Sequence, residues 1–179
     1  MSSAPAKRPI PMATTPTTEL DARYGEEGVA PTPWGAVEQL LTDAELYWLT
    51  TIRPEGGPHQ TPLIGVYRDG AVHFCTGPHE AKARNIAGTD KVVISTGTND
   101  LHAGTDVVVE GTAVRVTADA EVVTLARAWE DKYGAEWHFD AHDGAFHHEA
   151  GAAHVFRVEP TRAYAFGKAP YSHTRYTFP

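Results

Sequence analysis

The sequence predicts a mainly β domain in which about six strands close into a small barrel with helices at its ends. Three observations support this prediction. Short segments alternate apolar with polar residues, Gly, Pro and Asp separate these segments at hairpin spacing, and helical periodicity is confined to short intervals. The chain has 179 residues, of which 41% are hydrophobic and 21% charged, so it is long enough for one domain with a substantial core.

The N-terminal region differs in composition from the rest of the chain. It is rich in Pro, Ser, Thr and Ala and shows no sustained helical or strand period. We therefore expect a disordered or draped arm over residues 1–31, able to pack on a neighbouring subunit, and one domain over residues 32–179. The domain is expected to open with a short helix, which Thr32 caps and Pro33 begins.

Three strands with tight turns are predicted next. A two-residue period covers residues 46–53, and the turn sequence at 54–57 joins this strand to a second one near residues 59–68. The dipeptide Asp69–Gly70 is an equally strong turn into a third strand, residues 72–76, which alternates as a half-buried strand does. Short loops between consecutive strands predict an antiparallel meander.

The second half of the chain continues the β pattern around one longer helix. The Val-rich segments 91–96 and 106–116 predict buried strands. Residues 122–133 have apolar side chains at helical spacing and predict an amphipathic helix. Residues 154–166 predict the last strand, with Pro160 marking a bulge or a change of strand.

Residues 135–151 show no sustained period and predict a loop crowded with His, Asp and Gly. Six of its side chains are of the types that bind divalent metals, namely His138, Asp140, His142, His147, His148 and Glu149. Two imidazoles four residues apart share a face only in a helix, which Gly144 and the Asp residues disfavour. We therefore expect no metal, and keep a metal-dependent enzyme built on this loop as an alternative.

Composition restricts the partners and the compartment. A formal net charge of −8 argues against nucleic acid, because a phosphate backbone requires a basic face. No apolar run approaches the length of a membrane span, and the N-terminus lacks the apolar core of a signal peptide. The single cysteine, Cys75, fits a reducing environment. The expectation is a cytoplasmic protein that contacts neither membrane nor nucleic acid.

The segment from Val72 to Gly88 is the best candidate for a binding site. A strand ends in the turn Thr76–Pro78, and a helix follows. A helix N-terminus after a strand presents unpaired N–H groups and a partial positive charge, which favour an anion. Lys82, Arg84 and Asn85 supply further donors, so the segment predicts a phosphate-binding site. The alternative is a surface helix whose basic side chains are solvated.

Five short motifs occur in order along the chain: residues 47–53 (YWLTTIR), 58–63 (PHQTPL), 74–77 (FCTG), 82–85 (KARN) and 107–113 (VVVEGTA). Together they resemble the pyridoxamine 5'-phosphate oxidase-like family of flavin- and deazaflavin-dependent oxidoreductases. The resemblance covers roughly residues 33–178 and implies the FMN-binding split β-barrel, a mainly β fold with flanking helices, assembled as a homodimer with the cofactor at the interface.

The family resemblance also implies an activity and a set of site residues. It suggests hydride transfer between the deazaflavin coenzyme F(420) and a small organic acceptor, with FMN as the alternative cofactor. The cofactor-binding residues that it implies are Lys82, Arg84 and Asn85 at the phosphate, Thr76 and Gly77 in the turn, Gln60, Thr61 and Pro62 along the ring, Arg53 and His59 beside the groove, and Arg175 from either copy. No catalytic side chain is assigned, because hydride transfer depends on close approach and exclusion of water. Proton delivery by His59, His73, His79 or Tyr171 stays open.

Two alternatives share the fold. One is an FMN-binding oxidase or reductase of the pyridoxamine 5'-phosphate oxidase type, and the other is a non-catalytic flavin or haem binding protein. The deazaflavin tail carries several carboxylates, whereas the chain is acidic overall. Binding this coenzyme therefore requires a local basic groove, for which the candidates are Lys82, Arg84, Lys91, Lys168 and Arg175.

Overall fold

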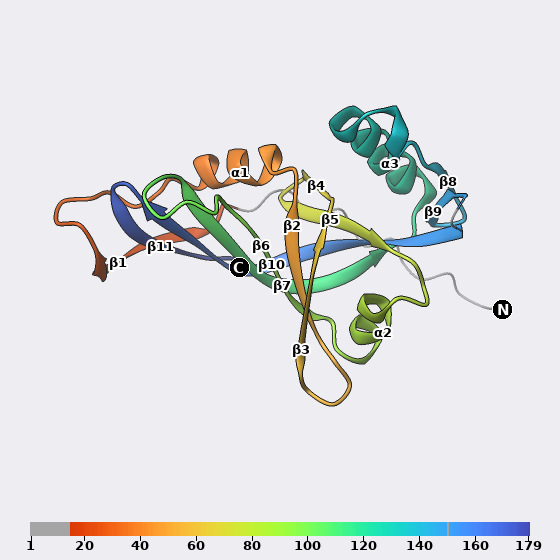
Figure 1. Ribbon diagram of the computed structural model, residues 1–179, viewed down its shortest axis with the longest axis horizontal. Helices are drawn as coiled ribbons and strands as arrows, with labels where there is room; N and C mark the ends of the chain where they lie inside the picture. The colour runs from red at the N-terminus through yellow and green to blue at the C-terminus, as the bar shows by residue number, and fades with distance from the viewer. Residues whose placement is uncertain (1–14, 150) are drawn as a thin grey trace.

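The computed structural model describes residues 15–149 and 151–179. The described chain is mainly β, with three α-helices set around one extended sheet (Figure 1). In chain order the elements are β1 (Thr17–Gly25), α1 (Trp34–Asp43), β2 (Tyr47–Ile52), β3 (Pro58–Leu63), β4 (Val66–Arg68), β5 (Ala71–Thr76), α2 (Ala81–Gly88), β6 (Lys91–Thr96), β7 (Thr105–Val116), α3 (Asp119–Tyr133), the short 3-10 helix η1 (Ala135–Trp137), β8 (Asp140–His142), β9 (Ala145–His148), β10 (Gly151–Lys168) and β11 (Tyr171–Thr177).

The strands pair in the order β1-β11-β10-β7-β6-β2-β3, and each of these pairs is antiparallel. β1 and β3 lie at the two ends of this path and do not pair with each other in the described chain, so the sheet is not closed. The mainly β prediction with flanking helices is confirmed, whereas the expectation of strands closing into a barrel is wrong. In the described chain β1 and β3 each pair with one strand only, so each has one edge without a strand partner.

The long strand β10 organises the sheet. One of its edges pairs with β7, the other edge pairs in turn with β5 and β11, and its first residues pair with β9. The β10–β7 register shifts between Pro160 and Arg162, which confirms the bulge predicted at Pro160. Since β5 and β11 occupy different stretches of the same edge, they lie at opposite ends of β10.

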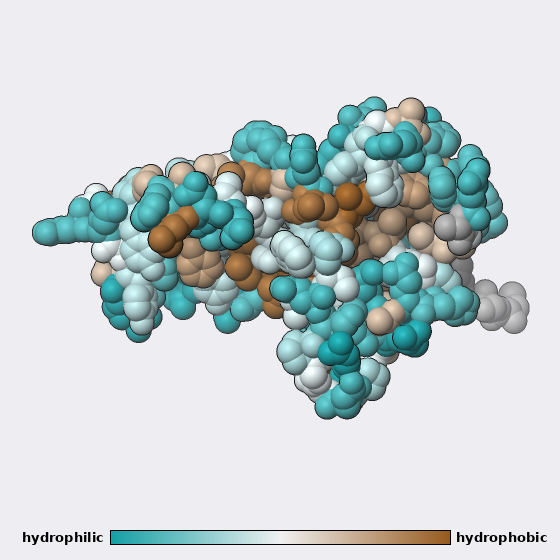
Figure 2. Space-filling view, in the orientation of Figure 1, coloured by the Kyte–Doolittle hydropathy of each residue, from teal (hydrophilic) through white to brown (hydrophobic). Residues whose placement is uncertain are grey.

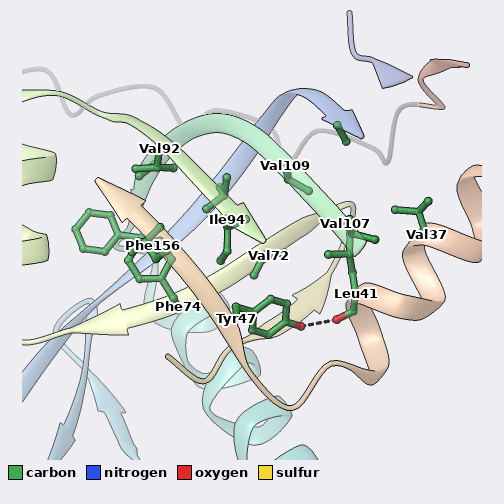
Figure 3. Close-up of a cluster of buried hydrophobic side chains, with 14 of the residues drawn as sticks. Val37, Leu41, Tyr47, Val72, Phe74, Val92, Ile94, Val107, Val109 and Phe156 are labelled. Atoms are coloured by element: carbon green, nitrogen blue, oxygen red, sulfur yellow. Dashed lines mark hydrogen bonds between the residues drawn. The ribbon is translucent and has the colours of Figure 1, made fainter. Parts of the chain in front are cut away.

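The main core lies between the strands and α1 (Figure 3). Tyr47 and Leu49 of β2 are fully buried there with Phe74 of β5, and Leu41 of α1 packs against them. The Tyr47 hydroxyl donates a hydrogen bond to the Leu41 carbonyl oxygen, which ties α1 to the start of β2. α1 begins one residue later than expected, with Pro33 at the cap position and no side-chain capping bond, so the capping role expected of Thr32 is wrong.

A second core lies beneath α3. Val122, Leu125 and Trp129 of α3 pack with Phe146 of β9 and Val155 of β10. α3 therefore covers the face of β5 and β10 that points away from the main core. In Figure 1 it lies above these strands, while α2 lies below them. None of the helices in the described part of the chain is long and apolar enough to cross a membrane.

Several elements differ from the sequence expectations. The strand expected over residues 59–68 is divided into β3, which pairs with β2, and β4, which pairs with β5, so the simple meander is wrong. The division occurs at Gly65, where an added Cβ would lie 2.5 Å from the His73 carbonyl oxygen. Close approach of two backbones at this glycine ends one pairing and starts the next.

The two chain ends and the histidine-rich segment hold strands that the sequence analysis missed. Residues 17–25 form β1, which pairs with β11, although no strand was expected before residue 32; the rest of the expected arm, residues 1–14, lies outside the described residues. β8 and β9 form a hairpin within residues 135–151, where a loop was expected. The division of the chain into an arm and a domain at residue 31 stays a prediction.

Candidate cofactor site

The strand–turn–helix segment predicted to bind phosphate forms as expected. Thr76 ends β5, and the Glu80 N–H donates to the Gly77 carbonyl oxygen at 3.0 Å before α2 begins at Ala81. The helix ends at Gly88, as predicted. This turn places the Gly77 N–H and the first residues of α2 around one small region.

Within that region two donors converge on the carboxylate of Glu80. The Gly77 N–H donates to Oε1 at 2.8 Å, and the Lys82 ammonium donates to Oε2 at 2.6 Å. The Lys82 side chain is 15% exposed and the Glu80 side chain 51%, so the ammonium group is shielded from solvent whereas the carboxylate is half exposed. Burial raises the pKa of Glu80, but the hydrogen bonds from Lys82 and Gly77 outweigh burial and hold that pKa below its ordinary value.

Arg84 and Asn85 already have partners inside the protein. The Arg84 guanidinium donates to the His79 carbonyl oxygen. Asn85 is 4% exposed, and its Nδ2 donates to Thr51 Oγ1 at 2.9 Å. The Asn85 side chain therefore holds α2 against β2, and its amide N–H is engaged within the fold.

β3 presents its predicted site residues on two opposite faces. His59 and Thr61 point to the same side as the buried Thr51, whereas Gln60 and Pro62 are exposed on the other side. Of the elements in the described chain, β3 pairs only with β2. This confirms that Pro62, which has no N–H to donate, lies on an edge strand.

Several polar atoms around this site are buried without a hydrogen-bond partner. Six such side-chain atoms occur in the described part of the chain, and three of them are His59 Nδ1, Thr61 Oγ1 and Thr76 Oγ1. All three belong to residues that the sequence analysis assigned to the cofactor. A buried polar group without a partner costs free energy, about 1–3 kcal/mol each. A bound ligand with complementary groups would remove that cost.

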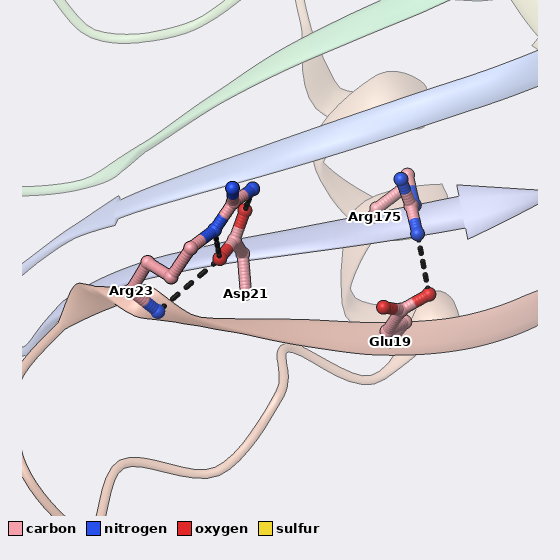
Figure 4. A network of polar contacts seen from close by, with 4 residues as sticks. All are labelled: Glu19, Asp21, Arg23 and Arg175. Carbon is pink, nitrogen blue, oxygen red and sulfur yellow. Dashed lines mark hydrogen bonds and ion pairs between the residues drawn. The ribbon is translucent and has the colours of Figure 1, made fainter.

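Two predicted residues lie apart from this cluster. Arg53 donates to the Pro58 carbonyl oxygen at 2.7 Å and so stabilises the β2–β3 turn. Arg175 on β11 forms an ion pair with Glu19 of β1 at 2.5 Å, next to the Asp21–Arg23 pair (Figure 4).

The distance along β10 shows how far Arg175 is from the cluster. Thr76 is paired with His154, and Arg175 is paired with Tyr164, ten positions further along the same strand (164 − 154). Ten strand residues span roughly 33 Å. Arg175 is therefore not brought to the α2 region of its own chain.

Four of the five cations proposed for a basic groove are paired with carboxylates, and the fifth, Arg84, donates to the His79 carbonyl oxygen. Lys91 lies 3.6 Å from Asp90, and Lys168 lies 3.0 Å from Asp106. Lys82 and Arg175 have Glu80 and Glu19 as partners, as described above. The positive charges expected to meet a carboxylate-rich tail are thus largely neutralised within the protein.

The β8–β9 hairpin holds the histidines considered as metal ligands. The rings of His142 and His147 stack with centroids 3.8 Å apart. Within residues 15–149 and 151–179, no group of three or more His, Cys, Asp or Glu side chains is arranged to hold a metal ion. The hairpin packs the apolar side of β9 beneath α3 through Phe146, which gives the segment a structural role.

The family profile of pyridoxamine 5'-phosphate oxidase matches residues 34–167, which is most of the chain. The chain belongs to this family. The family resemblance inferred from five short motifs is therefore confirmed, and the match extends from the start of α1 to the end of β10.

Solved structures agree with this assignment at the level of the fold. A conserved hypothetical protein from Mycobacterium tuberculosis is 16% identical with a TM-score of 0.64, covering 80% of this chain and 89% of that one. A heme binding protein from Mycobacterium smegmatis is 21% identical with a TM-score of 0.62, covering 82% and 58%. An F(420) reductase is 19% identical with a TM-score of 0.54, covering 70% and 94%. None of the curated proteins compared with the chain matches it.

Two residues of the site in this pyridoxamine 5'-phosphate oxidase family member were missed by the sequence analysis. Glu80 supplies the carboxylate at the start of α2, and Thr51 anchors Asn85. The sequence signal for Glu80 was its position just before the helix, where a carboxylate is favourable. Thr51 carried no local signal, because its partner is 34 residues away in the chain.

Proposed function

We propose that this protein is a homodimeric oxidoreductase that binds a flavin-type cofactor at the β5–α2 turn and transfers a hydride between the deazaflavin coenzyme F(420) and a small organic acceptor. The observation that supports it is the cluster of buried atoms without partners, His59 Nδ1, Thr61 Oγ1 and Thr76 Oγ1. Thr76 ends β5 at the turn where the Gly77 N–H and Lys82 both bind the Glu80 carboxylate, and His59 is paired with Thr51, to which Asn85 of α2 donates.

The residues present fit such a cofactor. The Gly77 N–H and Lys82 are suited to its phosphate, since both already bind a carboxylate in good geometry. His59 and Thr61 offer unused donor or acceptor atoms along β3, and Thr76 offers a hydroxyl at the turn. When bound, the flavin or deazaflavin ring supplies the hydride chemistry, and the protein supplies position and shielding from water.

The homodimer is proposed because large hydrophobic side chains are exposed in a single copy. Trp48 and Leu46 expose large hydrophobic surfaces at β2, 47% and 55% exposed. Figure 2 shows one face of the molecule, on which hydrophobic residues gather mainly in the middle with mostly polar residues around them. A second copy against this face would cover the apolar surface and bring its own Arg175 toward a cofactor that Arg175 cannot reach within one chain.

FMN is the second candidate cofactor, in an oxidase or reductase of the pyridoxamine 5'-phosphate oxidase type. The pairing of Lys91, Lys168 and Arg175 with carboxylates favours it, because FMN carries one phosphate and needs fewer free cations than a carboxylate-rich tail. A non-catalytic flavin or haem binding protein is the further alternative. The similar fold of a heme binding protein from Mycobacterium smegmatis supports keeping it in the test.

The test is an equilibrium titration of the purified protein with coenzyme F(420), FMN and haem. We expect binding of a flavin-type cofactor that Lys82→Ala weakens by about 10- to 100-fold, since a shielded charge-assisted hydrogen bond is lost. Arg68→Ala is the matched control, because it removes an equal charge from an exposed pair on β4. Hydride transfer from the reduced coenzyme then separates an enzyme from a carrier.

The outcomes separate the candidates. Preferential FMN binding would support the proposed site but identify FMN, and not F(420), as the cofactor. Haem binding without flavin binding would replace the oxidoreductase with a haem binding protein. Flavin binding that is equally insensitive to Lys82→Ala and Arg68→Ala would contradict the location of the site.

A further inference from the structure

The carboxylate of Glu80 occupies the place in which the proposed cofactor's phosphate would be expected. We call this place the anion site and define it by the Gly77 N–H, the Lys82 ammonium and the Thr76 hydroxyl. Glu80 accepts hydrogen bonds from the first two of these groups, at 2.8 and 2.6 Å. The protein's own side chain thus uses the donors that a ligand's anion requires.

Glu80 and the anion of a ligand would compete for the same backbone donor. A Cβ added at Gly77 would lie 3.1 Å from Glu80 Oε1 and 3.6 Å from Glu80 Cγ. The carboxylate is therefore packed directly against the turn, and the Gly77 N–H has a single hydrogen to donate. A phosphate can accept the Gly77 hydrogen bond only when the Glu80 side chain moves away.

The third group of the anion site points independently to a ligand. Thr76 is 3% exposed, and its hydroxyl has no hydrogen-bond partner of good geometry. It is nevertheless close enough to Glu80 to help lower the pKa of that carboxyl. The site thus offers three donors, and Glu80 satisfies two of them, whereas a phosphate has enough oxygen atoms for all three.

We propose that Glu80 determines the affinity and charge selectivity of the cofactor site by occupying the anion site until a phosphate-bearing ligand displaces it. This inference rests on the proposed function, because it concerns the same site. Its consequence is a competition between two anions for the same donors. A ligand that lacks an anionic group has nothing to gain from the displacement.

The Glu80→Gln variant tests this competition, because it keeps the length of the side chain and removes its charge. Three probes are titrated in parallel: FMN, riboflavin, which is the same ring system without phosphate, and inorganic phosphate alone. We expect FMN and inorganic phosphate to bind about tenfold more tightly to Glu80→Gln than to the wild type, and riboflavin to bind equally to both.

Glu130→Gln on α3 is the matched control. Glu130 also pairs with a basic side chain, His138, and its replacement changes the net charge equally, so it should leave all three affinities unchanged. If net charge alone were responsible, both variants would bind FMN and phosphate more tightly to the same extent, and this result would overturn the inference. So would FMN and phosphate binding that weakens in Glu80→Gln, because Glu80 would then be a group that positions Lys82 for the ligand.

The same experiment distinguishes failure of the inference from failure of the proposed function. Phosphate binding that tightens in Glu80→Gln, with no flavin bound by either protein, would support the anion competition and overturn the flavin assignment. Flavin binding that depends on Lys82 but is unaffected by Glu80→Gln would support the flavin assignment and overturn the competition.

Discussion

β5 and β11 pair with the same edge of β10, yet their surroundings differ. β5 is covered on both faces, by the main core on one side and by α3 on the other, so Val72, His73 and Phe74 are all buried. β11 alternates between buried and exposed residues, because only its inner face is covered. The half-buried pattern predicted for β5 is thus wrong, and it describes β11 instead.

The ion pairs beside the two strands show what this difference means for binding. Lys82, after β5, is 15% exposed, and its partner Glu80 is 51% exposed but also accepts a backbone N–H. Arg175 on β11 and its partner Glu19 are 48% and 63% exposed. Water and salt screen the second pair, so it contributes little to stability. The first pair differs in the shielding of its lysine and in the backbone N–H that converges on the same carboxylate, and for these reasons the anion site is proposed there.

The largest expected effect concerns His73, the buried histidine of β5. Burial, together with the nearby Arg157 charge, lowers the pKa of His73 from 6.5 to about 4. Because the native state favours the neutral ring, the stabilisation is complete above pH 6.5 and is lost as the pH falls toward 4. The loss amounts to about 3 kcal/mol of unfolding free energy.

Urea unfolding of the wild type and of His73→Gln, measured between pH 7 and pH 4, checks this expectation. The variant is expected to be less stable at neutral pH and to lose less stability on acidification, because its side chain does not titrate. Equal slopes for the two proteins would show that His73 titrates normally and that β5 is not shielded on its α3 side.

The next effect concerns the anchor of α2. Asn85 donates to Thr51 Oγ1 inside the protein, and Gln60 donates in the same way to Thr50 Oγ1 at 3.1 Å on the exposed face. Asn85→Ala is expected to lower the unfolding free energy by about 1–3 kcal/mol, because it leaves a buried hydroxyl without its donor.

Gln60→Ala removes an equivalent amide-to-hydroxyl bond where water can replace it, so a change within about 0.5 kcal/mol is expected. Thermal or urea unfolding of the two variants without cofactor gives the comparison. Equal losses would mean that the α2 side of β2 is as accessible to water as its outer face.

The smallest effect is expected at β11. Glu19→Gln breaks the pair with Arg175, whose groups are both well exposed. The unfolding midpoint should fall slightly at low ionic strength and match the wild type at high salt, because the lost attraction is screened. A large loss that persists at high salt would show that β1 depends on this pair and would remove the contrast with Lys82.

Much of the fold was predictable because its signals are local. The two-residue period and turn at residues 46–57, the Val-rich β6 and β7 and the helical spacing of α3 each arise from neighbouring residues, and the structure confirms them. β11 was missed because Ser172 and Thr174 on its inner face are buried hydroxyl-bearing residues, so the strand has no apolar alternation.

The candidate site divides in the same way. The sequence alone determined the Thr76–Gly77 turn, the helix after it and the presence of Lys82 in its first turn, since turn and helix signals depend on adjacent residues. Only the tertiary structure decided that Glu80 binds these donors, that Asn85 faces β2 and that Arg175 lies at the far end of β10. Hydrogen-bond partners and burial are set by strands paired across long separations in the chain, and no local pattern encodes them.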